Sequence, residues 1–364
     1  MHIGSRIRCL FTLIFFCRCA LALTATAAQW PPLPERDGQI VIPAQEWPHQ
    51  PGPREVKVYI HYPNGALDQV GPGTGLMLTL HNWGGTGARG TADPQALAGR
   101  YDVIAIAVDY LQSGPYEIDS GIPYDCGYLQ ALDALRALYS LYHGLDVARR
   151  PFDRTRLYAT GGSGGGNVAL MANKLAPRTF ACIVDMCGMA KLSDDIAFGL
   201  PGGTLLNAGY IRDPDDPRHL SEDAQLIRFL GYPPHAAVMK QLGCAAKIIV
   251  VHGANDDVCP VADAREMATG LREAGLHVEP HFITESDLDG KVLTSSGHPL
   301  GDRTRIVFRF ADQYLLPASP KAAKRPGPSD FERPADPVRY PTPNGAYVID
   351  YAEGYPVARF EPTP

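Results

Sequence analysis

The 364-residue sequence lacks several features that would place it in common classes of protein. It has no excess of positive charge, because 33 Lys and Arg face 39 Asp and Glu, and the net charge of −6 argues against nucleic acid or an anionic membrane surface as partner. It has no Cys/His spacing typical of a zinc site and no evident internal repeat. We therefore expect neither a metal nor another cofactor.

A long hydrophobic run is also missing. The apolar stretch Cys9–Cys17 is too short to span a bilayer, so we expect no membrane span. Arg6 and Arg8 precede it, and Ala25-Thr26-Ala27 offers a small-residue cleavage site. These features predict an export signal at residues 1–28 and a secreted or periplasmic protein; an uncleaved anchor and a misassigned start codon are the alternatives.

Cysteine is sparse, with eight in the chain. Three fall in the expected signal, which leaves an odd number, so at least one thiol must stay unpaired within the chain. One or two disulfides remain open, and sequence alone cannot pair the five that follow: Cys126, Cys182, Cys187, Cys244 and Cys259. A small buried apolar role explains Cys182 and Cys187 equally well.

The most informative feature present is Gly161-Gly162-Ser163-Gly164-Gly165, directly after the strand-like run Arg156–Thr160. A serine on a tight strand-to-helix turn takes strained backbone angles, and its neighbours must lack side chains so that the chain can fold back. An ordinary glycine-rich loop is the alternative. A phosphate-binding P-loop is disfavoured, because no Lys-Ser/Thr pair follows the glycines. We expect a nucleophile elbow with Ser163 as the nucleophile.

An acid should follow the elbow in the chain. The β-branched run Ile248–Val251 predicts a buried parallel strand, and it leads into a loop that contains Asp256 and Asp257. A carboxylate at the carboxyl end of that strand would share the sheet edge of the elbow. We expect Asp256 as the acid, with Asp257 as the close rival and Asp185 as a third candidate; a helix N-cap is the non-catalytic alternative.

A histidine should come last, and His298 lies in a loop between a strand-like segment and a helix-like one. An imidazole at that point can lie over the elbow, take the Ser163 proton as base and return it to the leaving group as acid. His281 alternates within a strand and His252 precedes a glycine at a strand end. We interpret both as structural and expect His298 as the base.

Oxyanion donors are expected from two places. The residue after the nucleophile, Gly164, supplies one backbone N–H, and the loop after the core strand Gly75–Leu80 commonly supplies the second. Trp83 lies in that loop, and the neighbouring side-chain amide of Asn82 is a further candidate donor. An aromatic pocket wall is the alternative role for Trp83.

Together these motifs resemble the α/β-hydrolase superfamily over roughly residues 55–316. The stretch from His252-Gly253 through Asp256 to Pro260 is most similar to the branch that contains prolyl-oligopeptidase-type peptidases, dienelactone-hydrolase-like enzymes and secreted esterases. The resemblance implies an α/β fold: a doubly wound, mostly parallel eight-stranded sheet with helices on both faces and a Ser163–His298–Asp256 triad.

The remaining segments suggest a domain plan. Residues 29–54 are punctuated by proline and read as an N-terminal arm before the catalytic domain at 55–316. A cap insertion is expected at about 188–242, with Tyr210 and Phe198 as candidate substrate-binding residues. Residues 317–364 read as a Pro-rich linker and C-terminal tail, with two short strands at its end.

These observations favour a serine hydrolase that cleaves a small-molecule or polymeric carboxylic ester through an acyl-enzyme. A serine peptidase acting on short peptides is the second hypothesis, and it rests on the family resemblance. A non-catalytic binding module of the same fold is the third, and the presence of every expected catalytic residue type in the right order argues against it. Oligomeric state is not predicted.

Overall fold

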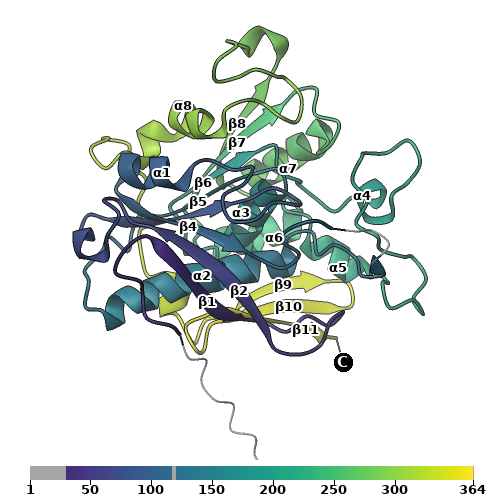
Figure 1. The fold of residues 1–364 in the computed structure, drawn as a ribbon. Coiled ribbons are helices and arrows are strands. Elements are labelled where there is room, and N and C mark those ends of the chain that lie inside the picture. The colour runs from purple at the N-terminus through teal and green to yellow at the C-terminus, as the bar shows by residue number, and fades with distance from the viewer. Residues whose placement is uncertain (1–29, 117–119, 364) are drawn as a thin grey trace, which may run out of the picture.

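A computed structural model describes residues 30–116 and 120–363, which fold around a central eight-stranded sheet (Figure 1). Its strand order is β1-β2-β4-β3-β5-β6-β7-β8. β1 and β2 pair antiparallel with each other and β2 with β4, whereas all the other pairs are parallel. The eight strands are β1 (Gly38–Ala44), β2 (Arg54–His61), β3 (Gly75–Leu80), β4 (Val103–Asp109), β5 (Leu157–Gly162), β6 (Cys182–Met186), β7 (Lys247–Gly253) and β8 (His277–Ile283). The predicted doubly wound, mostly parallel sheet is confirmed.

Helices cover both faces of this sheet, as its apolar strands require. β3, β5 and β6 are buried along their whole length, because parallel strands are apolar toward both faces. On one face lie α2 (Tyr128–Val147), α3 (Gly164–Leu175) and α7 (Val261–Glu273), and on the other lie α1 (Pro94–Tyr101) and α8 (Arg303–Leu315) (Figure 1). The helices leave the carboxyl edge of the sheet to the connecting loops.

The connection between β6 and β7, where a cap was expected, contains three short helices: α4 (Asp194–Phe198), α5 (Glu222–Ile227) and α6 (Pro233–Gln241). α4 lies at the outer side of the molecule, beyond the carboxyl edge (Figure 1). α6 instead packs against α7, so it belongs to the helical layer of the main domain.

The C-terminal residues form a second, three-stranded antiparallel sheet from β9 (Val338–Thr342), β10 (Gly345–Asp350) and β11 (Val357–Pro362). The two short strands predicted at the end of the tail are confirmed as β10 and β11. The fully buried Tyr340 and Tyr351 donate hydroxyl hydrogen bonds to carbonyl oxygens at the end of α3. The small sheet therefore extends the hydrophobic core on the α2/α3 side.

The segment expected as a linker, residues 317–337, packs closely on the domain. Asp330 is fully buried and pairs with Arg178 at 2.7 Å between Oδ1 and Nε, and Phe331 joins the main core. A short 3₁₀ turn, η4 (Asp330–Glu332), holds this point. The segment thus connects α8 to β9 through fixed contacts.

Three sequence predictions concern export and cysteine. The expected signal at 1–28 lies outside the described residues and stays a prediction. None of the helices that the structure describes is long and apolar enough to cross a membrane. Within residues 30–116 and 120–363, all five cysteines are buried and free, so neither of the disulfides left open by the sequence is formed there.

Candidate active site

Ser163 occupies the turn between β5 and α3 with φ 56° and ψ −124°, a backbone conformation that residues with side chains rarely adopt. Its N–H donates to Met186 O at 2.8 Å, and its carbonyl accepts the Asn167 N–H at 3.1 Å. These two bonds fix the turn between β6 and the first turn of α3. The residue is buried, 7% exposed, and it lines a pocket at the sheet edge.

The glycines around Ser163 are required by close packing. A β-carbon at Gly161 would collide with the Gly165 backbone, and one at Gly165 would collide with the carbonyl oxygens of Leu80 and His81. The first turn of α3 therefore lies directly against the end of β3. The glycine pattern that predicted an elbow has this physical cause.

Ser163, His298 and Asp256 form a hydrogen-bonded chain across three connecting loops. His298 Nε2 lies 2.9 Å from Ser163 Oγ, and His298 Nδ1 lies 2.9 Å from Asp256 Oδ2. In the tautomer that satisfies both contacts, Nδ1–H donates to the carboxylate and Nε2 accepts from the serine hydroxyl. The structure thus brings the three predicted residues together.

The rival acids are placed elsewhere. Asp257 is exposed beside the buried Asp256. Asp185 is fully buried at the end of β6, where its Oδ1 accepts the Gly188 N–H at 2.9 Å. Of the three candidates, Asp256 is the one in contact with His298.

The Asp256 carboxylate is fully buried but well supplied with donors. Oδ1 accepts the N–H groups of Val258 at 3.0 Å and Cys259 at 2.9 Å, in addition to the bond from His298. Burial alone would raise the pKa of Asp256, but the hydrogen bonds from His252 and His298 hold it well below its usual range. The carboxylate therefore stays ionised beside His298.

His252, interpreted from the sequence as structural, lies next to this carboxylate. Its Nε2 donates to Cys259 O at 2.8 Å and is 3.3 Å from Asp256 Oδ2. This contact was not predictable from the sequence, because a histidine before a strand-end glycine is common. The Cys187 thiol accepts the Gly253 N–H nearby, so hydrogen bonds account for the proximity of Cys187, His252 and Asp256.

The predicted oxyanion donors are placed unequally. Trp83 N lies 2.8 Å from where a β-carbon on Gly164 would be, so the two backbones are in close contact, and both residues line the serine pocket. The Asn82 side chain packs against Gly85 and Gly90 of its own loop and is not among the residues that line the serine pocket. Of the three predicted donors, Gly164 and Trp83 lie at the serine pocket and Asn82 does not.

The pocket at Ser163 is nearly filled by its walls, with a cavity volume of about 10 Å³. Trp83 forms one wall and stacks on Tyr124 with ring centroids 3.7 Å apart and planes 7° apart. The other lining residues are uncharged: Cys126, Gln130, Asn167, Met189, Leu206 and Cys259. Tyr124 and Cys126 were not predicted as pocket residues, because their loop after β4 carries no recognisable motif.

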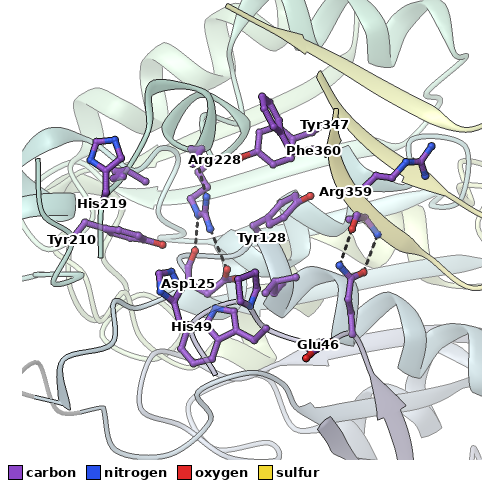
Figure 2. Close-up of a pocket in the computed structure, with 17 residues that line it drawn as sticks. Glu46, His49, Asp125, Tyr128, Tyr210, His219, Arg228, Tyr347, Arg359 and Phe360 are labelled. Carbon is purple, nitrogen blue, oxygen red and sulfur yellow. Dashed lines mark hydrogen bonds and ion pairs between the residues drawn. The ribbon is translucent and has the colours of Figure 1, made fainter. Parts of the chain in front are cut away.

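Tyr210 and Phe198, the predicted substrate-binding residues, do not line this pocket. Tyr210 borders a separate cavity of about 320 Å³ between the insertion, the loop after β1 and the C-terminal sheet. Figure 2 shows Arg228 facing Asp125 in this cavity, where the two form an ion pair at 3.1 Å, with Tyr128 and Tyr210 beside them. Phe198 packs under the Arg212 guanidinium, 4.2 Å from the ring centroid.

Comparisons with known proteins agree with the fold. Residues 147–316 match the model of the prolyl oligopeptidase family. A search of curated proteins finds no match. Two solved structures of Pyrococcus horikoshii acylaminoacyl peptidase have TM-scores of 0.52 and 0.51 at 15% and 16% identity, and cover 78% of this chain.

The chain spans less than half of those peptidases, 42% and 43% of their length. A carboxylesterase, EstE1, cloned from a metagenomic library, has a TM-score of 0.40 at 17% identity, with 70% of this chain and 80% of that chain covered. The sheet topology and the serine elbow show the α/β-hydrolase fold, and residues 147–316 are similar to the prolyl oligopeptidase family.

Proposed function

We propose that the chain hydrolyses carboxylic esters with short acyl groups, with Ser163 as nucleophile, His298 as general base and acid, and Asp256 as the acid that orients His298. The observation that carries the proposal is the continuous chain from Ser163 Oγ to His298 Nε2 at 2.9 Å and from His298 Nδ1 to Asp256 Oδ2 at 2.9 Å.

The proposed mechanism has two halves. In the first, His298 Nε2 takes the Ser163 proton while Oγ attacks the ester carbon, and the imidazolium then protonates the departing alcohol. The backbone N–H groups of Gly164 and Trp83 stabilise the oxyanion, each by roughly 3–4 kcal/mol. In the second half, His298 removes a proton from water, which attacks the acyl carbon. The bond from this carbon to Ser163 Oγ then breaks, Oγ takes the proton back from His298, and the acid is released.

The walls of the pocket support a short, uncharged acyl group. A cavity volume of about 10 Å³ leaves little room for a long chain, and the described lining residues offer no charged side chain to anchor a peptide terminus. Acetyl and similar small acyl groups would require the smallest movement of these walls. The alcohol, from a small molecule or a polymer, would lie outside this pocket.

The first test measures hydrolysis of p-nitrophenyl esters from acetyl to palmitoyl. We expect activity to peak at the shortest chains, and Ser163→Ala to lose at least about 10³-fold in kcat while it keeps the wild-type Tm. Fluorophosphonate should label the wild type and not the variant. Unchanged turnover in the variant would remove the assignment of Ser163, and a maximum at palmitoyl would remove the short-acyl proposal.

A serine peptidase acting on short peptides is the second candidate, and the match of residues 147–316 to the prolyl oligopeptidase family favours it. Amide cleavage needs efficient protonation of a poorer leaving group by His298. A panel of free and N-acylated aminoacyl p-nitroanilides, measured beside the esters, separates the two candidates. Labelling by fluorophosphonate with turnover of anilides alone would establish the peptidase.

A further inference from the structure

The cavity of about 320 Å³ that Tyr210 borders has no role in the mechanism above, and no residue of the proposed triad lines it. Its volume lies at the lower end of the range for small-molecule sites, roughly 300–1,000 Å³. Five aromatic side chains, from the loop after β1, α2, the insertion and the C-terminal sheet, line it (Figure 2): Trp47, Tyr128, Tyr210, Tyr347 and Phe360. Segments far apart in the sequence thus converge on one aromatic cavity.

Three of these aromatic side chains are tyrosines whose hydroxyls lack a protein partner. Tyr128, Tyr210 and Tyr347 are at most 9% exposed, yet none of their hydroxyls makes a hydrogen bond to another described residue. Their oxygens are not enclosed by protein either, in contrast to the buried, unpartnered hydroxyl oxygen of Tyr142 in the core. The small exposed part of each side chain therefore faces the cavity. Because a buried tyrosine hydroxyl usually has a hydrogen-bond partner, this arrangement points to a ligand that supplies one.

The charged groups in the cavity are already paired within the protein. Arg228 Nη2 lies 3.1 Å from Asp125 Oδ1, and Arg228 Nε donates to Asp125 O at 2.6 Å. Figure 2 shows the Tyr210 hydroxyl directed toward this pair. The exposed Arg359 pairs with Glu361 at 2.8 Å between Nη2 and Oε1. An anionic ligand would have to displace these carboxylates, so the cavity does not suit an anion.

A cation and an alkyl chain fit the lining no better. The Arg228 guanidinium already lies over two of the aromatic rings, with Cζ 5.4 Å from the Tyr128 ring centroid and 6.0 Å from that of Tyr210. Burial and the nearby Arg228 lower the pKa of His49, so this lining imidazole is neutral at neutral pH. An alkyl chain would leave the three tyrosine hydroxyls without hydrogen bonds. The lining thus suits a neutral molecule with several hydroxyl groups.

We propose that this cavity binds a neutral sugar ring. The face of an aromatic ring is negative and attracts the weakly positive C–H groups on one side of such a ring. The sugar hydroxyls can both donate to and accept from the hydroxyls of Tyr128, Tyr210 and Tyr347. The site does not depend on the proposed function, because it shares no residue with the triad.

One short stretch of chain, residues 124–130, lies between the sugar site and the serine pocket. Three of its residues, Tyr124, Cys126 and Gln130, line the pocket. Three others, Asp125, Tyr128 and Leu129, line the cavity. A sugar in the cavity would therefore contact the same stretch that forms one wall of the serine pocket.

The test measures binding to the wild-type protein by isothermal titration calorimetry. The probes are neutral sugars: methyl glucopyranoside, methyl galactopyranoside, methyl xylopyranoside and cellobiose. Glucuronate, choline and p-cresol are the anionic, cationic and aromatic comparison ligands. We expect at least one neutral sugar to bind with a Kd of about 1 mM or tighter, and more tightly than all three comparison ligands.

Tyr210→Phe and Tyr347→Phe place the binding in the cavity, because each removes one hydroxyl and keeps the ring. Tyr142→Phe is the matched control, since it also removes a buried, unpartnered hydroxyl but does not line the cavity. We expect each cavity variant to weaken sugar binding about 2- to 10-fold, the double variant to weaken it further, and the control to bind as the wild type does. The Tm of each variant is recorded; if one cavity variant fails to fold, the other serves as the test.

Several results would overturn the proposal. One is the absence of binding of every neutral sugar to the wild type. Another is wild-type affinity in the folded cavity variants, or an equal loss in Tyr142→Phe, because the sugar would then bind elsewhere. Tighter binding of glucuronate, choline or p-cresol than of the sugars would show that the cavity takes a ligand of that class instead.

Discussion

At the scale of single residues, the buried carboxyl group of Asp185 leads us to predict how the free energy of unfolding depends on pH. Burial raises its pKa from 3.8 to about 7. Between these values the folded protein holds a proton that the unfolded chain releases. The stabilisation from this group is therefore complete below pH 3.8 and is lost as the pH rises through about 7.

Asp185→Asn removes this dependence, because the amide does not ionise. We expect the free energy of unfolding of the variant to rise relative to the wild type between pH 5 and 8, by about 1.4 kcal/mol per pH unit within the window at most. Urea denaturation of both proteins at the two pH values measures the difference. Parallel curves would show that Asp185 does not hold a proton in the folded state.

The residues of the site were predictable to different degrees. Ser163 and His298 follow from a local glycine pattern and a fixed chain order, which are visible in sequence. Asp256 could not be separated from Asp257 by position, and the structure distinguishes them by burial. The role of His252 depends on the Asp256–Cys259 turn folding back over β7, which no local pattern reveals.

At the scale of elements, the close contact between α3 and β3 predicts the effect on stability of adding a methyl group at Gly165. Gly165→Ala would place a β-carbon against the carbonyl oxygens of Leu80 and His81, which are backbone atoms that cannot rotate away. We expect Gly165→Ala to lower Tm by several degrees and to lose activity, because α3 and the Trp83 loop must separate.

Gly99→Ala is the matched control. Gly99 lies within α1 and a β-carbon there meets no atom within 4 Å. Alanine should stabilise the helix by about 0.5–1 kcal/mol. Thermal denaturation of the two variants gives opposite signs if the close approach of α3 to β3 is the cause. Equal tolerance of both substitutions would show that the elbow can relax.

Elements were predicted best where a pattern is local. The β-branched run that forms β7 and the buried run that forms β3 were identified from the sequence alone. The strand β9 was not, because proline-rich composition around it suggested a linker. The placement of Tyr210 and Phe198 also failed to follow from sequence, since short helices in the insertion are oriented by distant contacts.

At the scale of the whole molecule, the C-terminal sheet is predicted to be part of the cooperative core. Tyr340 is fully buried and its hydroxyl donates to Lys174 O at the end of α3. Tyr340→Ala should cost about 3–5 kcal/mol of unfolding free energy, because it leaves a cavity and an unpaired carbonyl. The variant should unfold in one transition at lower temperature, detected by far-UV circular dichroism.

Phe360→Ala on β11 provides the comparison, since its ring is 39% exposed. We expect a much smaller change in Tm there. If Tyr340→Ala shows a separate transition at low temperature while the main transition keeps the wild-type Tm, the small sheet folds independently instead.

The loop after β1 and the last strand are joined by reciprocal hydrogen bonds: Gln45 Nε2 donates to Ala358 O at 2.7 Å, and the Ala358 N–H donates to Gln45 Oε1 at 2.8 Å. These partners are 313 positions apart. During synthesis, Gln45 leaves the ribosome long before Ala358 is added to the chain, so its side chain has no hydrogen-bond partner on β11 until then. Contacts of such long range slow folding. The contact between Gln45 and β11 therefore forms only after all three catalytic residues have been synthesised. A nascent chain that contains these three residues still lacks β11 and this contact.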